Sequence, residues 1–238
     1  MDWVDTSGYY SYTIEVPYRI TPLVTDNYYH IFNRGVAHQP TFLLARDYER
    51  FLLYLSYYRH NEAPVRLSKL LQIPVDSRKK ILDGLETTND AIVEIVAYCC
   101  MPNHFHILLK QKMNGGVSLF MKKITDGYTR YYNTKHQRVG PLFQGAFKAV
   151  HISSNEQLLH VSRYIHLNPL MSAVVRDNDF LTFPWSSLQS YINDKSSPFV
   201  NPQPILENFR NSQKYLEFIK DQIDYGKRLQ EIKHLTFE

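Results

Sequence analysis

Cysteine is scarce in this chain, which has 238 residues but only the adjacent pair Cys99 and Cys100. Neighbouring residues in an extended strand point to opposite faces, so these two thiols are badly placed for a disulfide with each other. A protein without structural disulfides suits a reducing compartment, and we therefore expect it to be cytoplasmic.

Long apolar runs are also missing. No stretch approaches the roughly 20 apolar residues that a membrane-spanning helix needs. The first 20 residues include Asp2, Asp5 and Glu15, and they lack the basic start and apolar run that are typical of a signal peptide. We therefore expect no membrane partner.

The excess of positive charge is small, with 27 Lys and Arg against 23 Asp and Glu, which gives a formal net charge of +4. Such an excess suits a polyanionic partner, but it also describes many soluble enzymes. The hydrophobic content of 44% is enough to bury one core. We expect one main domain at residues 27–170 with an insertion at 62–90, an N-terminal extension at 1–26 and a C-terminal helical extension at 171–238.

Hydrophobic periodicity predicts the order strand, helix, strand, strand, helix, strand, helix in the main domain. The expected strands are residues 28–35, 92–99, 104–110 and 142–150, and the expected helices are 47–61, 119–132 and 155–167, the last stopped by Pro169. Two shorter helical patterns, at 67–71 and 78–85, lie in the insertion. This order fits an α+β fold of the ferredoxin-like type, because two helices can bury their apolar stripes on one face of a four-stranded antiparallel sheet.

Two histidines lie two residues apart in the third expected strand. Because side chains alternate along a strand, His104 and His106 share one face, while Phe105 points to the other. Two neutral imidazoles form part of a metal site. The same spacing also occurs between histidines that bind nothing, so the spacing needs a second observation to support it.

The expected helix at 155–167 supplies that observation. Tyr164 and Asn168 are four residues apart, which places both side chains on one helix face. An amide oxygen could complete a metal site there, with a phenol one turn away. A phenol is a poor nucleophile at neutral pH unless a metal ion polarises the phosphate that it attacks or a base takes its proton.

The chain contains 18 tyrosines, most of which must serve packing or lie on the surface. Tyr128 and Tyr132 are rival nucleophiles, because they share a helix face at four-residue spacing and follow the histidines in the sequence. We prefer Tyr164, because Asn168 gives it a metal partner.

Four segments, taken in order, resemble the single-tyrosine HUH transposases, and among them the REP-associated tyrosine transposase branch. The resemblance covers about residues 27 to 190, and four motifs in order are far more specific than any one of them. The segments are Tyr29-His30-Ile31-Phe32-Asn33-Arg34-Gly35, Met101-Pro102-Asn103-His104-Phe105-His106, Gly140-Pro141-Leu142-Phe143-Gln144-Gly145 and Tyr164-Ile165-His166-Leu167-Asn168-Pro169.

The resemblance implies a ferredoxin-like nuclease domain that cuts and rejoins single-stranded DNA beside imperfect hairpins. It implies that His104, His106 and Asn168 hold Mg²⁺ or Mn²⁺, and that Tyr164 becomes linked to a DNA 5′-phosphate while the cut strand keeps a free 3′-hydroxyl. It also implies a homodimer.

Cationic and polar side chains near these motifs are candidates for DNA binding, because phosphates are bound by Lys, Arg and amide groups. The candidates are Asn33, Arg34, Lys122, Lys123, Arg130, Gln144 and Lys148. Two features depart from the family pattern. Ala146 stands where the family often carries arginine, which weakens the case for a DNA contact there, and the insertion at 62–90 is longer than in compact members.

Three functions remain in competition. A metal-dependent DNA nicking and joining enzyme explains all four residues of the candidate site. A catalytically silent regulator that binds DNA hairpins has no physical need for all of them. A phosphodiesterase that activates water would need more carboxylate ligands, and no cluster of Asp or Glu flanks the histidines.

Overall fold

The computed structural model describes residues 22–88, 90–193 and 197–235, so most of the expected N-terminal extension at 1–26 lies outside the described residues. Its centre is a four-stranded sheet in the order β2-β3-β1-β4, in which every neighbouring pair is antiparallel. The strands are β1 (Tyr28–Arg34), β2 (Val93–Met101), β3 (His104–Gln111) and β4 (Lys148–Ile152).

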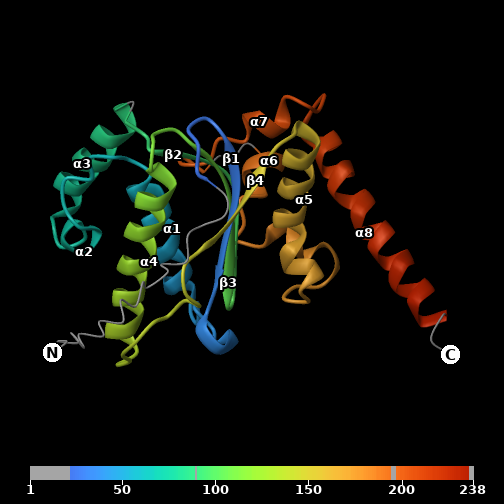
Figure 1. The fold of residues 1–238 in the computed structure, drawn as a ribbon, viewed down its shortest axis with the longest axis horizontal. Helices are drawn as coiled ribbons and strands as arrows, with labels where there is room; N and C mark the ends of the chain where they lie inside the picture. Colours follow the sequence, from blue (N-terminus) through green and yellow to red (C-terminus); the bar gives the residue numbers. More distant parts are fainter. Residues whose placement is uncertain (1–21, 89, 194–196, 236–238) are drawn as a thin grey trace, which may run out of the picture.

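Helices cover both faces of this sheet (Figure 1). On one face lie α1 (Ala45–Tyr58) and α4 (Gly116–Lys135), which also contact each other. On the other face α5 (Asn155–Met171) packs against β2, β3 and β4. The α+β ferredoxin-like fold is therefore confirmed, with two helices on one face as expected, and α5 adds a layer on the opposite face.

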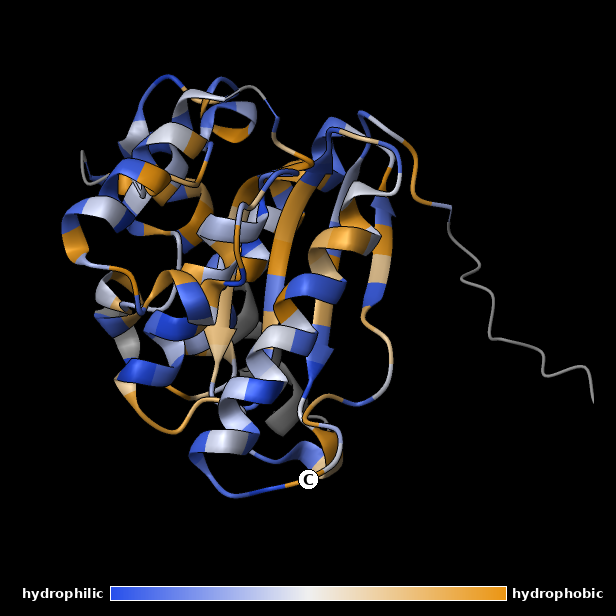
Figure 2. Ribbon diagram, turned by 90° about the vertical axis from the view of Figure 1, so that its left-hand side faces the viewer, coloured by the Kyte–Doolittle hydropathy of each residue, from blue (hydrophilic) through white to orange (hydrophobic). Residues whose placement is uncertain are grey.

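The alternation of side chains along β1 explains how one strand serves both layers. Tyr29 and Ile31 are fully buried, whereas His30 and Phe32 are only partly buried on the face that α5 covers. Figure 2 shows the strands of the sheet as largely hydrophobic, with hydrophilic residues recurring along the surrounding helices. Polar side chains can therefore lie close together on the face of β1 and β3 under α5, because this face is only partly buried and does not lie wholly within the apolar core.

Two boundaries differ from the expected ones. The strand expected at 142–150 begins only at Lys148, because Gly145 adopts a positive φ of 67° that interrupts extended backbone. Pro169 lies inside α5 and does not end it. The N–H that Pro169 lacks removes one hydrogen bond near the end of the helix. The carbonyls of Asn168 and Pro169 still accept from the N–H groups of Ser172 and Val174, so the helix ends about one turn later than expected.

Further helices flank this core in the described part of the chain. The insertion contains α2 (Leu67–Leu70) and α3 (Val75–Thr87), and η1 (Val36–His38) follows β1. Beyond α5 come η2 (Asp177–Thr182), α6 (Gln189–Ile192), α7 (Gln203–Leu206) and α8 (Ser212–Leu235). This C-terminal part is fastened to the core by Trp185, which stacks on Tyr48 at 4.5 Å between ring centroids. No helix of the described part is long and apolar enough to cross a bilayer.

The two cysteines lie side by side on β2, with both thiols buried. Cys99 pairs with His106 in the sheet and therefore faces the α5 layer, whereas Cys100 pairs with Phe105 and faces α1 and α4. Burial raises the pKa of both thiols, so they remain protonated in the folded protein.

A buried carboxylate joins α1 to α4. Asp47 accepts hydrogen bonds from the backbone N–H groups of Leu43 and Leu44, from the Tyr131 hydroxyl at 3.0 Å and from the Lys135 ammonium at 2.6 Å. Burial acts to raise the pKa of Asp47, but these donors outweigh it and hold the pKa below its usual value. The group therefore stabilises the start of α1 and its contact with α4 at once.

Asp47→Asn is expected to lower the free energy of unfolding by about 2–3 kcal/mol at neutral pH, because an amide replaces a buried, charged acceptor. Since the pKa of Asp47 is lower in the folded state, its contribution is present above the unfolded value near 4 and is lost as the pH falls through the folded value. The difference between wild type and variant in urea unfolding should therefore narrow below about pH 4.

A matched control is Asp126→Asn, which removes an exposed carboxylate paired with Lys122 at 2.8 Å. Exposed pairs contribute little, so this change should alter the free energy of unfolding by less than about 0.5 kcal/mol. Equal effects of the two substitutions would contradict the role assigned to Asp47.

Candidate active site

The paired histidines stand at the start of β3, beside the end of β1. His104 lies opposite Arg34 and His106 lies opposite Phe32 in the antiparallel register. Residues directly opposite one another share a face of the sheet, so all four side chains are directed toward the side that α5 covers. The imidazole rings of His104 and His106 are 5.0 Å apart and nearly perpendicular.

The helix α5 brings the second half of the site. It begins at a Ser154 cap, whose hydroxyl accepts from the Gln157 N–H at 3.1 Å. Buried Leu158 and Ile165 hold the helix on the sheet. One turn beyond Ile165, Asn168 is also buried.

Tyr164 and Asn168 face the histidines as the helical spacing predicts. The Asn168 Oδ1 atom lies 3.3 Å from His104 Nε2, and the ring of Tyr164 meets the ring of His106 edge-on at 5.3 Å between centroids. Asn168 is only 4% exposed, whereas Tyr164 is 48% exposed. The amide is therefore fixed within the site, and the phenol stays accessible to a large substrate.

These residues line one open pocket of about 430 Å³. The structure brings the expected catalytic and metal-binding residues together there with four of the expected DNA-binding residues. The lining residues are Phe32, Asn33, Arg34, His104, His106, Gln144, Lys148, Tyr164, Asn168 and Ser172. Arg34 and Lys148 give the pocket a positive rim that suits a phosphate.

Hydrogen bonds fix how His104 presents its ring. The Asn103 amide donates from Nδ2 to the His38 carbonyl at 3.2 Å, so its Oδ1 is the acceptor that faces His104 Nδ1 at 2.7 Å. His104 therefore donates from Nδ1 and carries its lone pair on Nε2, toward the oxygen of Asn168. Two lone pairs that face each other at 3.3 Å repel unless a cation lies between them.

The electrostatics of the site favour neutral imidazoles. Burial lowers the pKa of His106 to about 2, and the charges of His30, His104 and Arg34 add to the shift. Burial also lowers the pKa of His104, and the charge of Arg34 adds to the shift, against the opposite effect of the Asn168 amide oxygen. A neutral imidazole offers its lone pair to a metal ion without first losing a proton.

The donor set fits a divalent cation with open coordination positions. Among the described residues, no three His, Cys, Asp or Glu side chains form a metal-binding group, so the site offers two imidazoles and one amide oxygen. Adjacent ligands of an octahedral ion lie about 3 Å apart, close to the separation of His104 and Asn168. Positions left free by the protein suit water and phosphate oxygens, which Mg²⁺ and Mn²⁺ accept.

Sequence reasoning missed His30. Its Nε2 lies 2.9 Å from His106 Nδ1, and its ring meets the Tyr164 ring edge-on at 5.9 Å. Burial lowers the pKa of His30 to about 4. The hydrogen bond holds His106 so that its Nε2 is free for a ligand, as the outer partners of metal-binding histidines do. Strand alternation puts His30 on the same face as Phe32 and Arg34, but only the register of β1 against β3 reveals its neighbour.

Other expected residues lie elsewhere. Lys122, Lys123 and Arg130 are on α4, on the face of the sheet opposite α5, and none of them lines the Tyr164 pocket. The rival nucleophiles are on the same helix. Tyr128 donates to the Thr41 carbonyl, Tyr132 donates to the Pro40 carbonyl, and both are buried.

Asn33, expected to contact DNA, also makes hydrogen bonds within the protein. Its amide donates to the Gly145 carbonyl at 3.2 Å, and its Oδ1 accepts from the Arg34 N–H at 2.8 Å. The side chain thus joins the end of β1 to the loop that contains Gln144, and it also lines the pocket.

The fold and the pocket together define a ferredoxin-like sandwich with a paired-histidine site that faces a tyrosine helix. Residues 75–168 match the model of a family described as "Transposase IS200 like". The matched segment includes His104, His106, Tyr164 and Asn168, so the resemblance carried by the sequence motifs is confirmed over these residues.

The fold is also similar to that of a solved structure. A structure described as that of a REP-associated tyrosine transposase bound to a REP hairpin is similar, with a TM-score of 0.51 and 14% identity, over 77% of this chain and 90% of that one. A candidate transposase from Deinococcus radiodurans R1 matches 60% of this chain and 90% of its own, with 17% identity and a TM-score of 0.27, too low to carry an argument. No curated protein matches the chain.

Proposed function

We propose that this protein is a metal-dependent endonuclease and strand transferase for single-stranded DNA, which acts at hairpin-associated sites through a 5′-phosphotyrosine intermediate. The observation that carries the proposal is the pocket that places Tyr164 against His106 and Asn168 against His104. The family match of residues 75–168 supports DNA as the substrate. The similar structure of a hairpin-bound transposase supports a hairpin beside the cleavage site.

The chemistry assigned to Tyr164 is a balanced exchange of phosphodiester bonds. The phenol oxygen attacks the scissile phosphorus, the bond from phosphorus to the 3′-oxygen breaks, and the phenol proton is lost to solvent while the leaving 3′-oxygen gains one. The protein is then joined to the 5′-phosphate, and the free 3′-hydroxyl remains. The reverse attack by a 3′-hydroxyl rejoins a strand without any external energy source.

The remaining pocket residues bind and orient the DNA. His104, His106 and Asn168 would hold Mg²⁺ or Mn²⁺, which would supply polarisation of the scissile phosphate. Arg34 and Lys148 stand at the rim, where they can bind the neighbouring phosphates, and the Gln144 amide adds a polar contact. The exposure of Tyr164 lets a strand reach the phenol without any rearrangement of the core.

We also propose that the protein works in the cytoplasm, where reduced thiols such as Cys99 and Cys100 persist. A homodimer is part of the same proposal, since it rests on the resemblance to dimeric transposases. Sedimentation velocity with and without hairpin DNA measures that oligomeric state directly.

Incubation of the protein with end-labelled single-stranded hairpin DNA and Mn²⁺ or Mg²⁺ tests the proposed reaction. A covalent protein–DNA species on a denaturing gel is expected with metal and is expected to disappear with EDTA. Peptide mass spectrometry should place the attached nucleotide on Tyr164. Tight binding of several hairpins without any adduct would overturn the proposal and favour the silent DNA-binding regulator.

A further inference from the structure

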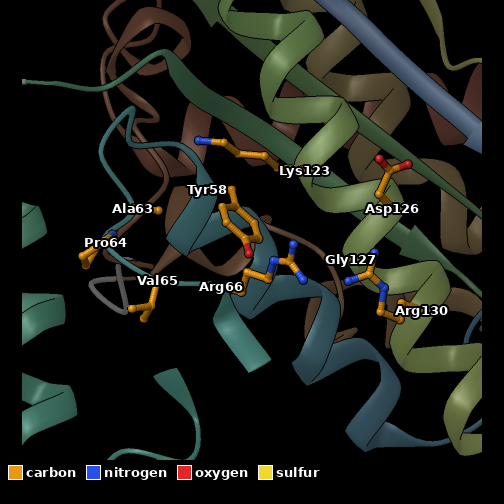
Figure 3. A pocket seen from close by; sticks show the side chains of 9 residues that line it. All are labelled: Tyr58, Ala63, Pro64, Val65, Arg66, Lys123, Asp126, Gly127 and Arg130. Atoms are coloured by element: carbon orange, nitrogen blue, oxygen red, sulfur yellow. The ribbon is translucent and has the colours of Figure 1, made fainter. Parts of the chain in front are cut away.

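A second groove lies on the face of the molecule away from Tyr164. It consists of two adjoining cavities of about 380 and 500 Å³, the smaller of which is drawn in Figure 3. Both cavities are lined by Tyr58, Arg66, Gly127 and Arg130. Its walls come from α1, α4 and the first residues of the insertion at 62–90. We call it the insertion groove.

Positive charge gathers in the insertion groove from separate parts of the chain. Arg50 comes from α1, Arg66 from the insertion, and Lys123 and Arg130 from α4. Figure 3 shows the guanidinium groups of Arg66 and Arg130 turned toward each other across the groove. Among the described residues, neither of these two arginines has a carboxylate partner within ion-pair distance.

The one carboxylate in the lining does not neutralise these arginines. Asp126 pairs at 2.8 Å with Lys122, a residue that does not line the groove. Two like charges that face each other without a direct ion pair repel, which destabilises the empty groove. An anion between Arg66 and Arg130 removes that repulsion and accepts from both planar guanidinium groups, a geometry that suits phosphate oxygens.

The lining also indicates what kind of phosphate compound fits. Ser68, Gln72 and Thr134 add hydroxyl and amide groups, which commonly contact nucleic-acid backbones. The rings of Tyr54 and Tyr58 are only 4% and 8% exposed, so they offer no open face on which a base could stack. Cations spread along two adjoining cavities match a chain of phosphates better than one isolated phosphate.

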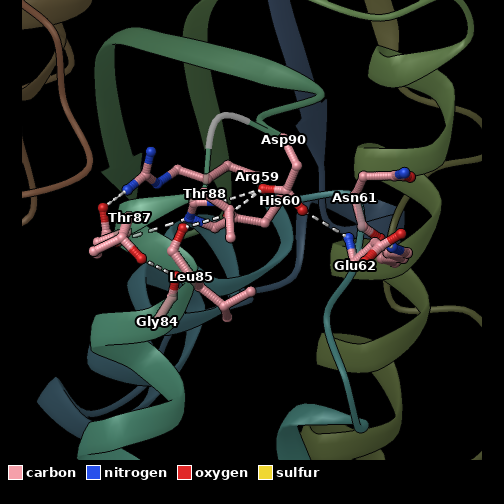
Figure 4. A network of polar contacts seen from close by, with 11 residues as sticks. Arg59, His60, Asn61, Glu62, Gly84, Leu85, Thr87, Thr88 and Asp90 are labelled. Carbon is pink, nitrogen blue, oxygen red and sulfur yellow. Dashed lines mark hydrogen bonds and ion pairs between the residues drawn. The ribbon is translucent and has the colours of Figure 1, made fainter.

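The insertion is firmly held in the position that forms this groove (Figure 4). Asp90 is the last residue of the insertion, and Glu62 is the first. The Asp90 carboxylate pairs with His60 at 3.0 Å and accepts a hydrogen bond from the Glu62 N–H at 3.2 Å. Arg59 pairs with Glu86 of α3. Because both ends of the insertion are fastened beside the end of α1, Arg66 is held over α4.

We propose that the insertion groove is a second DNA-binding surface, which contacts the phosphate backbone without reading base sequence and lies across the sheet from the Tyr164 pocket. The choice of DNA as the polyanion rests on the proposed function. The insertion at 62–90 then has a physical purpose, because it supplies Arg66 and one wall of the groove.

The test measures DNA binding without chemistry. Fluorescence anisotropy of a labelled DNA hairpin is recorded in EDTA, in a Tyr164→Phe background, over a range of salt concentrations. The groove variant carries Arg66→Gln and Arg130→Gln. The matched control carries Arg46→Gln and Lys79→Gln, which remove the same charge at exposed positions outside both pocket linings.

We expect the groove variant to raise the Kd at least about tenfold and to lower the slope of log K against log salt by about 2, because two phosphate contacts are lost. The control variant should bind like the parent. Equal affinity in groove and control variants overturns the second surface, whatever the adduct experiment shows. Short-chain polyphosphate that competes as well as DNA at equal phosphate concentration also overturns it, in favour of a site for a free phosphate compound.

The adduct experiment fails or succeeds independently. Suppose that the wild-type protein forms no adduct, but that the Arg66→Gln, Arg130→Gln variant binds the hairpin more weakly than wild type. The DNA-binding role of the insertion groove would then stand, and the proposed strand transfer would be wrong.

Discussion

Tyr164→Phe is expected to lower the yield of the covalent protein–DNA adduct by at least about a thousandfold, which removes it from a denaturing gel. The substitution deletes the only atom assigned to attack phosphorus and keeps the ring that meets His106 edge-on. Hairpin affinity should stay within about threefold of wild type, because one accessible hydroxyl is lost and no charge changes. The measurement is single-turnover adduct formation with Mn²⁺, together with anisotropy in EDTA.

Tyr132→Phe is the informative comparison, because it tests the rival nucleophile on α4. Its hydroxyl donates to the Pro40 carbonyl and is buried behind the sheet, so its loss should leave adduct yield unchanged and lower stability by about 1 kcal/mol. An adduct that persists in Tyr164→Phe and disappears in Tyr132→Phe would reverse the assignment.

His106→Ala is expected to weaken Mn²⁺ binding by at least about a hundredfold and to abolish cleavage, because one of the three proposed protein ligands is lost. His104→Ala should have an effect of similar size. His30→Ala is expected to weaken Mn²⁺ binding by about 10- to 100-fold, because His106 then loses the hydrogen bond that orients its ring. Calorimetric titration of the DNA-free protein with Mn²⁺ separates metal affinity from the reaction rate.

His160→Ala provides the matched control for these three variants. His160 is exposed on α5, the helix that carries Tyr164, but it pairs with Arg163 and does not line the pocket. Its loss should leave Mn²⁺ affinity unchanged. If His30→Ala also left the affinity unchanged, the orienting role of His30 would be wrong, although His104 and His106 could still be ligands.

The order of elements could be predicted from the sequence because it depends on local periodicity. The alternation of side chains along a strand places His104 and His106 on one face of the sheet, and four-residue spacing places Tyr164 beside Asn168 on one face of a helix. Neither placement depends on a tertiary contact. The structure agrees with both placements. Patterns of this kind depend only on residues that are close in the sequence, so a single sequence is enough to find them.

Contacts between distant segments could not be predicted in the same way. His30 meets His106 only because Phe32 lies opposite His106 in the register of β1 and β3. Lys123 and Arg130 were grouped with the Tyr164 site by charge alone, yet α4 carries them to the opposite face of the sheet. Charge patterns do not say which side of a sheet a helix covers.

The position of Pro169 shows a further limit of local rules. A proline was expected to stop the helix, but the cost of its missing N–H is small near the end of α5, where the last carbonyls find other donors. The extra turn keeps Asn168 within a regular helix, and its side chain is consequently held toward His104.

The reactivity of the two adjacent cysteines of β2 can show when the helix layers detach from the sheet. Cys99 is covered by the α5 layer and Cys100 by the layer of α1 and α4, and both thiols are fully shielded from solvent. A thiol reagent can therefore modify each only after the layer above it has lifted. Equal modification rates would mean that the two layers separate from the sheet in one cooperative event, whereas faster modification of Cys99 would mean that the helix carrying Tyr164 detaches first.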